Sequence, residues 1–566
     1  MHGNQSGQPV VTCYDRWHAT YEGPDAVDAV VFTGPDHARY PRPIFRHQPV
    51  VFTYDDHGYE TITPVSEPVR AARFTPDTPG EWRYAWMLGN RVVQAGSFRC
   101  EASAHPGFIE VSRHDPRYFA CTNGQPYLAI GLNLCWPVMF ALSTGQEFKT
   151  GTDQGTLGSR EFERWFQSLA AQGGNFARLW LGMHYLQPEG EVAGELDLVR
   201  FAAIDRVVEL ARRYDIRLKL CLEYFRTFRP GTPQSRVLQH PDDGRLPASM
   251  DEWFQSPDWQ TLWERKVDAL LARYGDDPIV MAWELWNEIN CCATNDFAIQ
   301  EAWTRRWLRR MKTASPRNLV TNSLGSFDWA GAQAQQDAFM MEEMDFQQVH
   351  RYLDQGASLE ICRTDPVAFS IDAVQRTRRA DRPVLLAETG AVNDCHSGPF
   401  RYYRADHDGL LFHDTTYPAF FAGAAGSGHC WHWDEYVDEK NLWAGFGALA
   451  AVTRGIALDR EQFVAKDVST DACWCLLLQG RTCTLGWLRN RADRWDHVLR
   501  DGQVAPMIPA MTLDLTPLGI RASRVEVYHP WADGETELPA PQDAQIQFPA
   551  FRHGLVFCIH HAADDA

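Results

Sequence analysis

Two glutamates follow apolar runs of the kind that form buried strands, and their type and spacing suit bond-breaking chemistry. Glu288 follows the run Ile-Val-Met-Ala-Trp-Glu-Leu-Trp-Asn that begins at Ile279, and Glu388 ends the run that begins at Val384. Cleavage of a glycosidic bond with retention needs one carboxylic acid to protonate the leaving oxygen and one carboxylate to attack the anomeric carbon. The two glutamates therefore predict glycoside chemistry.

The separation of the two glutamates indicates the fold that would hold them. Glu388 follows Glu288 by 100 residues. A (β/α)8 barrel of about 250 residues spends about 31 residues on each repeat, so this separation is about three repeats. We therefore expect the glutamates on strands four and seven of one barrel. The C-terminal ends of such strands form the rim where these barrels carry out their reactions.

Strand-like and helix-like segments alternate through the middle of the chain, as parallel βα units require. The helix-like segments 160–172 and 258–274 repeat apolar residues at i, i+3, i+4 and i+7, which predicts a buried helix face. The long connections 142–158 and 226–257 are expected to shape substrate access at the rim. The predicted barrel strands lie near 127–133, 174–181, 216–223, 279–286, 318–323, 345–350, 383–388 and 428–433.

The segments on either side of this barrel consist of short strand-like runs between Gly, Pro and Asp turns. The length of 566 residues is also more than one core usually supports. We therefore predict a multidomain protein in which a (β/α)8 TIM barrel is flanked by two β-sandwiches. The expected boundaries are 1–113, 114–462 and 463–566.

With Asn287-Glu288 and Glu388 in these positions, residues 114 to about 460 resemble the clan A retaining glycoside hydrolases, such as the family 5 cellulases and mannanases. The resemblance implies that Glu288 is the acid/base and Glu388 the nucleophile. It also implies that Asn287 binds the 2-hydroxyl of the reacting sugar. The stretch 73–84 looks like the immunoglobulin-like domain that precedes many barrels of this clan, with a structural role expected first and sugar binding as the alternative.

Other residues match the clan's pattern around the glutamates. Arg178 lies inside an apolar strand and therefore needs a buried partner; the clan has an arginine here, which would keep the nucleophile ionised. His350 and Tyr352 are similar to the clan's His-x-Tyr pair, in which tyrosine donates to the nucleophile. A core histidine with a satisfied ring is the alternative for His350.

Aromatic and polar residues at the other strand ends complete the predicted sugar site. The clan usually has a tryptophan after strand eight on which the sugar stacks, and Trp433 is preferred to Trp431 because it is nearer the rim. Glu223 would recognise a hydroxyl or tune Glu288. His429 and His432 lack a third ligand at suitable spacing, so neither a metal nor a cofactor is expected. The remaining candidates are Asn133, Trp136, His184 and Tyr224.

Composition limits the partners. The formal net charge is −19 and the pI is near 5.5, which argues against nucleic acid and anionic membranes as partners. No apolar run is long enough to span a membrane and no leader is recognisable, so a cytoplasmic location or a removed leader is expected. The 14 cysteines have no paired CxxC spacing and are expected to be reduced.

The sequence thus predicts a retaining β-glycosidase for gluco- or manno-configured oligosaccharides or glycosides, and we expect exo action. A second interpretation keeps the mechanism but changes the substrate to β-galactosides, β-xylosides or α-L-arabinosides. A third interpretation is a catalytically silent barrel that binds carbohydrate, although the presence of both glutamates argues against it.

Overall fold

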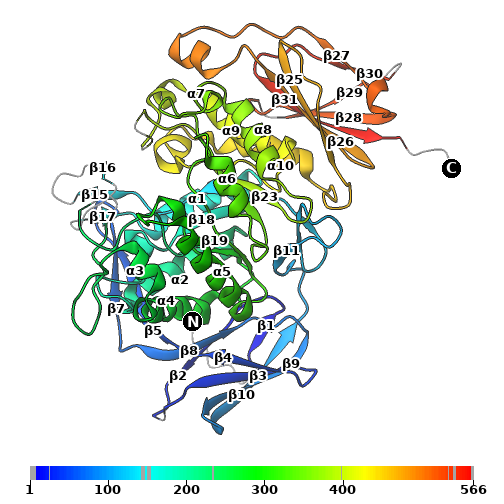
Figure 1. Ribbon diagram of the computed structural model, residues 1–566. Helices are drawn as coiled ribbons and strands as arrows, with labels where there is room; N and C mark the ends of the chain where they lie inside the picture. The colour runs from blue at the N-terminus through cyan, green and yellow to red at the C-terminus, as the bar shows by residue number, and fades with distance from the viewer. Residues whose placement is uncertain are drawn as a thin grey trace.

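The chain folds into three consecutive parts, shown in a computed structural model (Figure 1). The structure describes residues 8–562 except 25, 142–146, 149–153, 232–234, 395, 397, 533 and 540–543. An N-terminal β-rich part, drawn in blue, lies at one end of a central α/β barrel. A C-terminal β-rich part, drawn in orange and red, lies at the opposite end.

The N-terminal part contains two sheets and a separate hairpin. The larger sheet has the order β1 (Val10–Thr12), β10 (Arg91–Glu101), β9 (Gly80–Leu88), β3 (Ala29–Thr33) and β4 (Arg39–Pro43). The smaller sheet has the order β2 (Trp17–Tyr21), β8 (Val69–Phe74) and β5 (Phe45–His47). Aromatic residues from both sheets, including Phe32, Phe74 and Trp82, form one buried core. The hairpin consists of β6 (Val50–Tyr54) and β7 (Glu60–Pro64).

Seven regular parallel strands form the barrel wall. They are β14 (Gly131–Asn133), β18 (Phe176–Trp180), β19 (Arg217–Cys221), β20 (Val280–Glu284), β21 (Leu319–Thr321), β22 (Gln347–His350) and β23 (Val384–Glu388). Each lies inside its predicted range. The predicted eighth strand at 428–433 is not regular, because only an isolated bridge between Thr389 and Cys430 forms there. Cys430 still closes the barrel, since its carbonyl accepts from the Asn133 amide at 3.1 Å.

Helices follow the strands around the outside of the barrel. The two amphipathic predictions are confirmed as α1 (Ser159–Ala171) and α4 (Pro257–Tyr274). A short three-stranded unit, β15 (Met139–Ala141), β16 (Glu147–Phe148) and β17 (Gln154–Thr156), lies in the connection after β14. The other helices are α2 (Leu198–Arg213), α3 (Met250–Gln255), α5 (Phe297–Ala314), α6 (Ala332–Ala338), α7 (Glu360–Thr364), α8 (Pro366–Thr377), α9 (Leu410–Phe421) and α10 (Gly447–Thr453).

A small antiparallel sheet packs against the N-terminal ends of the barrel strands. It consists of β11 (Ile109–Val111), β12 (Phe119–Cys121) and β13 (Pro126–Tyr127). Phe119 packs edge-on against Phe346, at the start of the β22 segment, with ring centroids 5.5 Å apart. This sheet therefore covers the end of the barrel opposite the predicted catalytic rim.

The C-terminal part contains a six-stranded and a two-stranded sheet that enclose a second core. The larger sheet has the order β24 (Val464–Asp467), β25 (Cys473–Gln479), β26 (Cys483–Asn490), β31 (Gly554–His561), β28 (Ala522–Tyr528) and β29 (Glu535–Leu538). The smaller sheet pairs β27 (Met511–Asp514) with β30 (Gln545–Phe548). The other face of the larger sheet packs toward α9, where the Trp487 indole donates to His413 at 2.8 Å.

Polar contacts fix the N-terminal part to the barrel, among them one on β8 and one on the hairpin. Arg73 pairs with Asp205 of α2 at 2.7 Å. On the hairpin, Glu60 accepts from the Tyr54 hydroxyl at 2.9 Å and from the Ser159 amide at 3.1 Å, and it also accepts from the Tyr185 hydroxyl. Glu60 thus joins the hairpin to the start of α1 and to the 3-10 turn His184–Leu186. Among the described residues, no helix is long and apolar enough to cross a membrane.

Candidate active site

Glu388 ends β23 at the C-terminal rim of the barrel and points at two donors. The Tyr352 hydroxyl donates to Oε2 of Glu388 at 2.6 Å, and Arg178 Nη1 donates to Oε1. The Glu388 side chain is only 4% exposed. Burial raises the pKa of Tyr352 well above its usual value, and the charge of Glu388 adds to the rise, so the phenol remains a donor. Both carboxylate oxygens of Glu388 are therefore held in fixed directions.

Arg178 connects Glu388 to a second glutamate that the sequence analysis did not single out. Its Nε and Nη2 donate to the two oxygens of Glu284, each at 2.7 Å, in a bidentate pair with both side chains fully buried. Nη2 also donates to Asn287 Oδ1 at 2.6 Å, and Nη1 donates to Asn133 Oδ1 at 3.3 Å. The predicted buried partner of Arg178 is therefore found, and one guanidinium orders most of the site.

Glu284 is ionised because two cations surround it. Lys219 lies 3.3 Å from Glu284 Oε2 and also donates to Gln348. Burial favours the neutral carboxyl group, but Arg178 and Lys219 outweigh this effect and lower the pKa of Glu284 to about 2. Burial also lowers the pKa of Lys219 to about 8. The signal for these two residues was a charge inside an apolar strand, the same signal that identified Arg178.

Glu288 lies beyond its strand rather than at the strand end. β20 ends at Glu284, and Glu288 follows in the left-handed region at φ 52°. The Ser323 hydroxyl accepts from the Glu288 amide at 3.0 Å, which holds this strained turn. His350 Nδ1 lies 3.0 Å from Glu288 Oε1. Burial raises the pKa of Glu288 and the charge of Glu388 adds to the rise, whereas the hydrogen bond from His350 opposes it.

The two predicted catalytic carboxylates face each other across a short gap. One oxygen of Glu288 and one of Glu388 lie within 4.8 Å of each other, and both lie within 4.8 Å of a ring nitrogen of His350. His350 Nδ1 is also 3.5 Å from Glu388 Oε2. Carboxyl groups about 5–5.5 Å apart are typical of retention, whereas inversion needs about 6.5–9.5 Å to admit a water molecule. The short gap favours a nucleophile and an acid over a base-activated water.

The side-chain amide of Asn287 uses its oxygen in a hydrogen bond and leaves its nitrogen available as a donor. Its Oδ1 accepts from Arg178, whereas its buried Nδ2 has no hydrogen-bond partner among the described residues. The backbone N–H of Asn287 donates to the backbone carbonyl of Glu223 at 2.8 Å, which fixes the Asn287 backbone beside β19. The orientation of the side chain therefore leaves a donor beside the two glutamates.

Four tryptophans form a cluster near the glutamates. Trp136 lies 5.4 Å from Trp180, 5.6 Å from Trp431 and 4.7 Å from Trp433, measured between ring centroids. The preference for Trp433 is not supported by its position, because it is only 1% exposed and begins a π-helical turn instead of lying in a strand. Trp431 is partly exposed, so part of its ring is accessible from outside the cluster.

The structure does not support a ligand-binding role for the Glu223 carboxylate. The Glu223 side chain is fully buried and lies 2.6 Å from Arg226 and 3.3 Å from Lys266. Burial would raise its pKa, yet Arg226, Lys266 and Arg236 together lower it to about 2. These cations satisfy Glu223 inside the protein, which favours a structural role for its carboxylate.

The remaining predicted residues support the rim in different ways. Asn133 is fully buried and donates to the carbonyls of Ala387, His429 and Cys430 at 3.1–3.2 Å, so it positions Arg178 instead of meeting a ligand. Tyr224 stacks on Trp180 at 5.0 Å. The backbone of His184 begins the 3-10 turn near Glu60, while its side chain lies outside the described residues. Parts of the expected access loops, at 142–146, 149–153 and 232–234, also lie outside them.

His396 is a further polar residue at the rim that the sequence did not reveal. Its Nδ1 contacts Asp354 and lies 3.5 Å from Asp328, and its ring centroid is 6.2 Å from that of Tyr352. Burial opposes protonation, but the hydrogen bond to Asp354 and the charge of Asp328 raise the pKa of His396. No local motif marks this residue, because its partners come from two other loops.

Comparisons with known proteins show which proteins the chain resembles. No family model matches the chain. The chain is 30% identical over 253 residues to mannan endo-1,4-beta-mannosidase 4 of Oryza sativa subsp. japonica, covering 42% of this chain and 50% of that protein. It is 26% identical over 300 residues to mannan endo-1,4-beta-mannosidase 7 of Arabidopsis thaliana, covering 47% of this chain and 65% of that protein. The chain thus spans about half to two thirds of the length of these two relatives.

A solved structure from Bacteroides vulgatus ATCC 8482, described as a candidate glycoside hydrolase, matches 98% of this chain and 100% of its own, with a TM-score of 0.57 and 14% identity. This match supports the fold only. The sequence relatives agree with the predicted enzyme class, glycoside hydrolase, and the barrel fold is confirmed. The immunoglobulin-like nature of the N-terminal part stays a prediction.

Proposed function

We propose that this chain is a retaining glycoside hydrolase acting on β-mannosidic linkages. The observation that carries the proposal is the gap of at most 4.8 Å between carboxylate oxygens of Glu288 and Glu388, combined with their different partners. Glu388 accepts hydrogen bonds from Arg178 and Tyr352, which hold its two oxygens in fixed directions. Glu288 has a raised pKa, which favours the protonated form that an acid needs.

The roles of the neighbouring residues follow from these contacts. Glu388 attacks the anomeric carbon and forms a glycosyl-enzyme, while Glu288 protonates the leaving oxygen. Glu288 then removes a proton from water, which hydrolyses the intermediate and regenerates Glu388. The free Nδ2 of Asn287 is placed to donate to the 2-hydroxyl of the reacting sugar, and Trp431 offers a face for its C–H groups.

The choice of a mannosidic substrate rests on the names of the curated relatives, which are mannan endo-1,4-beta-mannosidases. Those names do not support the expectation of exo action, since they describe endo-acting enzymes. We therefore expect internal cleavage of β-1,4-mannan, with release of oligosaccharides before single sugars. The β-galactoside, β-xyloside and α-L-arabinoside alternatives stay as competing outcomes.

The test is hydrolysis of β-1,4-manno-oligosaccharides, with the anomers recorded by proton NMR in the first minutes and the product sizes by chromatography. First-formed β anomers support retention, and first-formed α anomers would overturn it. A parallel panel of aryl β-glycosides compares mannosides with glucosides, galactosides and xylosides. Activity confined to a non-mannosidic glycoside would overturn the substrate while leaving the mechanism in place, and Glu388→Gln serves as the inactive control.

A further inference from the structure

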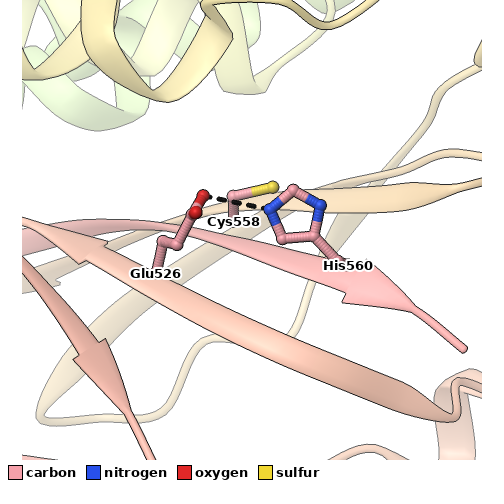
Figure 2. A group of neighbouring side chains, drawn as sticks. All are labelled: Glu526, Cys558 and His560. Atoms are coloured by element: carbon pink, nitrogen blue, oxygen red, sulfur yellow. Dashed lines mark hydrogen bonds and ion pairs between the residues drawn. The ribbon is translucent and has the colours of Figure 1, made fainter.

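The C-terminal sheet carries a cluster of ligand-type side chains that the proposed hydrolysis does not use. The cluster consists of Glu526 on β28 and of Cys558 and His560 on β31. One candidate ligand atom from each lies within 4.8 Å of the others. Figure 2 shows the three side chains converging, with Glu526 reaching toward His560. A donor set of one carboxylate, one thiol and one imidazole is thus already gathered.

The strand register explains why these residues meet. Residues i and i+2 of a strand point to the same face, so Cys558 and His560 share one face of β31. Glu526 is paired directly with Cys558, and Cys483 of β26 is paired directly with His560. Cys483 and Cys558 both belong to the buried core that this face of the sheet shares with the barrel. A fourth ligand-type side chain therefore lies beside the cluster, on the neighbouring strand.

The Nε2 atom of His560 contacts both a carboxylate and a guanidinium. Its Nε2 lies 3.0 Å from Glu526 Oε2 and 3.1 Å from Arg524 Nη2. One ring nitrogen cannot donate to the carboxylate and accept from the guanidinium together. A cation that takes the Nε2 lone pair and one oxygen of Glu526 would replace this shared contact with two coordinate bonds, and Arg524 would keep its own ion pair with Glu526 at 2.7 Å.

We propose that Glu526, Cys558 and His560 bind a divalent transition-metal ion, for which zinc is the best match, with Cys483 as the fourth ligand. Sulfur, nitrogen and carboxylate ligands in fourfold coordination are typical of zinc. Bond lengths of 2.0–2.3 Å place tetrahedral ligands about 3.3–3.8 Å apart, so small side-chain rotations would close the spacing of Glu526, Cys558 and His560, whose ligand atoms now lie within 4.8 Å of one another. Cys483 would have to turn toward them from the neighbouring strand. The ion would displace the thiol protons.

The charges and the burial suit such an ion. Cys558 and Cys483 are 1% and 3% exposed, whereas the side chains of Glu526 and His560 are 12% and 32% exposed. The ion could therefore enter from the His560 side and meet the thiols beneath. Arg524 pairs with Glu526 at 2.7 Å. Its positive charge would balance the carboxylate, and the two thiolates would balance the metal ion, which leaves the loaded site neutral.

The ion would connect three neighbouring strands near the end of the barrel. Next to Cys483, the Thr482 amide donates at 2.8 Å to Glu461, a residue that precedes the C-terminal sheet. The spacing Cys-x-His on one strand carries no zinc motif by itself, which is why the sequence did not predict this site. The sheet register brings the distant Glu526 and Cys483 to it.

The experiment is a titration of the full, metal-free chain with cobalt(II) and then zinc under a non-thiol reductant. Tetrahedral cobalt with thiolate ligands has intense visible bands and a charge-transfer band, which zinc should quench by displacement. We expect one equivalent to bind and zinc to raise the melting temperature of the wild type. Cys558→Ser and His560→Gln should each weaken binding by at least about 100-fold.

Matched control variants come from the same sheet: one lies on β31 itself and the other on β25. His561→Gln changes the neighbouring histidine, which contacts Thr484, and Cys475→Ser changes a thiol in the core on the opposite face of the sheet. Both should bind cobalt as the wild type does. Glu526→Gln, partly exposed, keeps the test decisive if a core variant fails to fold. Binding that is absent from the wild type, or equal in wild type and Cys558→Ser, would overturn the proposal. Unchanged charge-transfer intensity in Cys483→Ser would remove Cys483 from the ligand set.

Discussion

Arg178 and Glu284 form a bidentate ion pair, with both nitrogen–oxygen distances at 2.7 Å, inside a fully buried layer of the barrel. The same guanidinium contacts Glu388 and the Asn287 side-chain oxygen. Glu284 therefore fixes the plane of Arg178, and Arg178 transmits this geometry to the two residues that would meet the sugar.

Glu388→Gln should abolish turnover while preserving the fold. Glutamine has nearly the same shape, but it cannot attack the anomeric carbon, and we expect a loss of at least about 10³-fold in kcat. Steady-state kinetics on an aryl β-mannoside measures the loss, and circular dichroism checks the fold. Wild-type turnover in this variant would refute the nucleophile assignment.

Glu288→Ala should affect substrates according to their leaving groups. Substrates with poor leaving groups need protonation by Glu288, whereas activated aryl glycosides do not. We expect a much larger loss on manno-oligosaccharides than on a dinitrophenyl glycoside. The measurement is the ratio of kcat/KM for the two substrates. An equal loss on both would argue against the acid role.

His350→Phe should move the alkaline limb of the pH–rate profile to higher pH. Glu288 must be protonated to act as the acid, so activity falls as pH rises through its pKa. The hydrogen bond from His350 lowers that pKa, and its removal should therefore raise it. The pH profile of kcat/KM measures the shift. Tyr352→Phe removes a donor to Glu388, so it should reduce kcat and move the alkaline limb less. A shift of the limb to lower pH in His350→Phe would contradict the assignment of Glu288 as the acid.

Glu284→Gln should lower both stability and activity, and Glu223→Gln should lower stability alone. Each change leaves buried cations without their anion, at an expected cost of about 3–5 kcal/mol. Of these two glutamates, only Glu284 contacts Arg178. The Glu284→Gln variant alone should therefore also lose kcat. Chemical denaturation and kinetics on the same preparations make the comparison. A normal kcat in Glu284→Gln would show that Arg178 keeps its position without this pair.

The same two carboxylates predict how the free energy of unfolding depends on pH in acid solution. The folded-state pKa of Glu284 and of Glu223 is lowered to about 2. Their contribution is therefore complete above the unfolded value of about 4.3 and is lost as pH falls toward 2. The free energy of unfolding of the wild type should fall over this window. The slope should be shallower in Glu284→Gln, and equal slopes would contradict the shifted pKa.

Trp431→Ala and Trp433→Ala should have different effects. Trp431 is partly exposed, so its removal should raise KM with little change in stability. Trp433 is 1% exposed and packs on Trp136, so its removal should cost about 3–5 kcal/mol of stability. Substrate titration and thermal unfolding separate the two effects. A stability loss without a KM change in Trp431→Ala would place this ring in the core.

The sequence predicted the barrel and the central residues because strong local signals marked them. Apolar runs located seven strands, and Glu288, Glu388, Arg178 and Tyr352 have the expected neighbours. The predicted eighth strand, at 428–433, is not regular because this segment pairs with β14 and β23 only around Cys430. The preference for Trp433 relied on a strand at 428–433, whereas Trp433 begins a π-helical turn, so its stacking role stays a prediction. Glu223 resembled a rim carboxylate. Its partner Arg226 lies only three residues later, but Arg236 and Lys266 come from farther along the chain and could not be read from its own surroundings.

The attachment of the hairpin through Glu60 has a consequence for building chimeras of this protein. Glu60 accepts hydrogen bonds from Ser159, which begins the first barrel helix, and from Tyr185 on the rim. The N-terminal part is therefore not an interchangeable module. A donor domain grafted in its place would preserve the rim only if its own hairpin presented an acceptor to both of these partners.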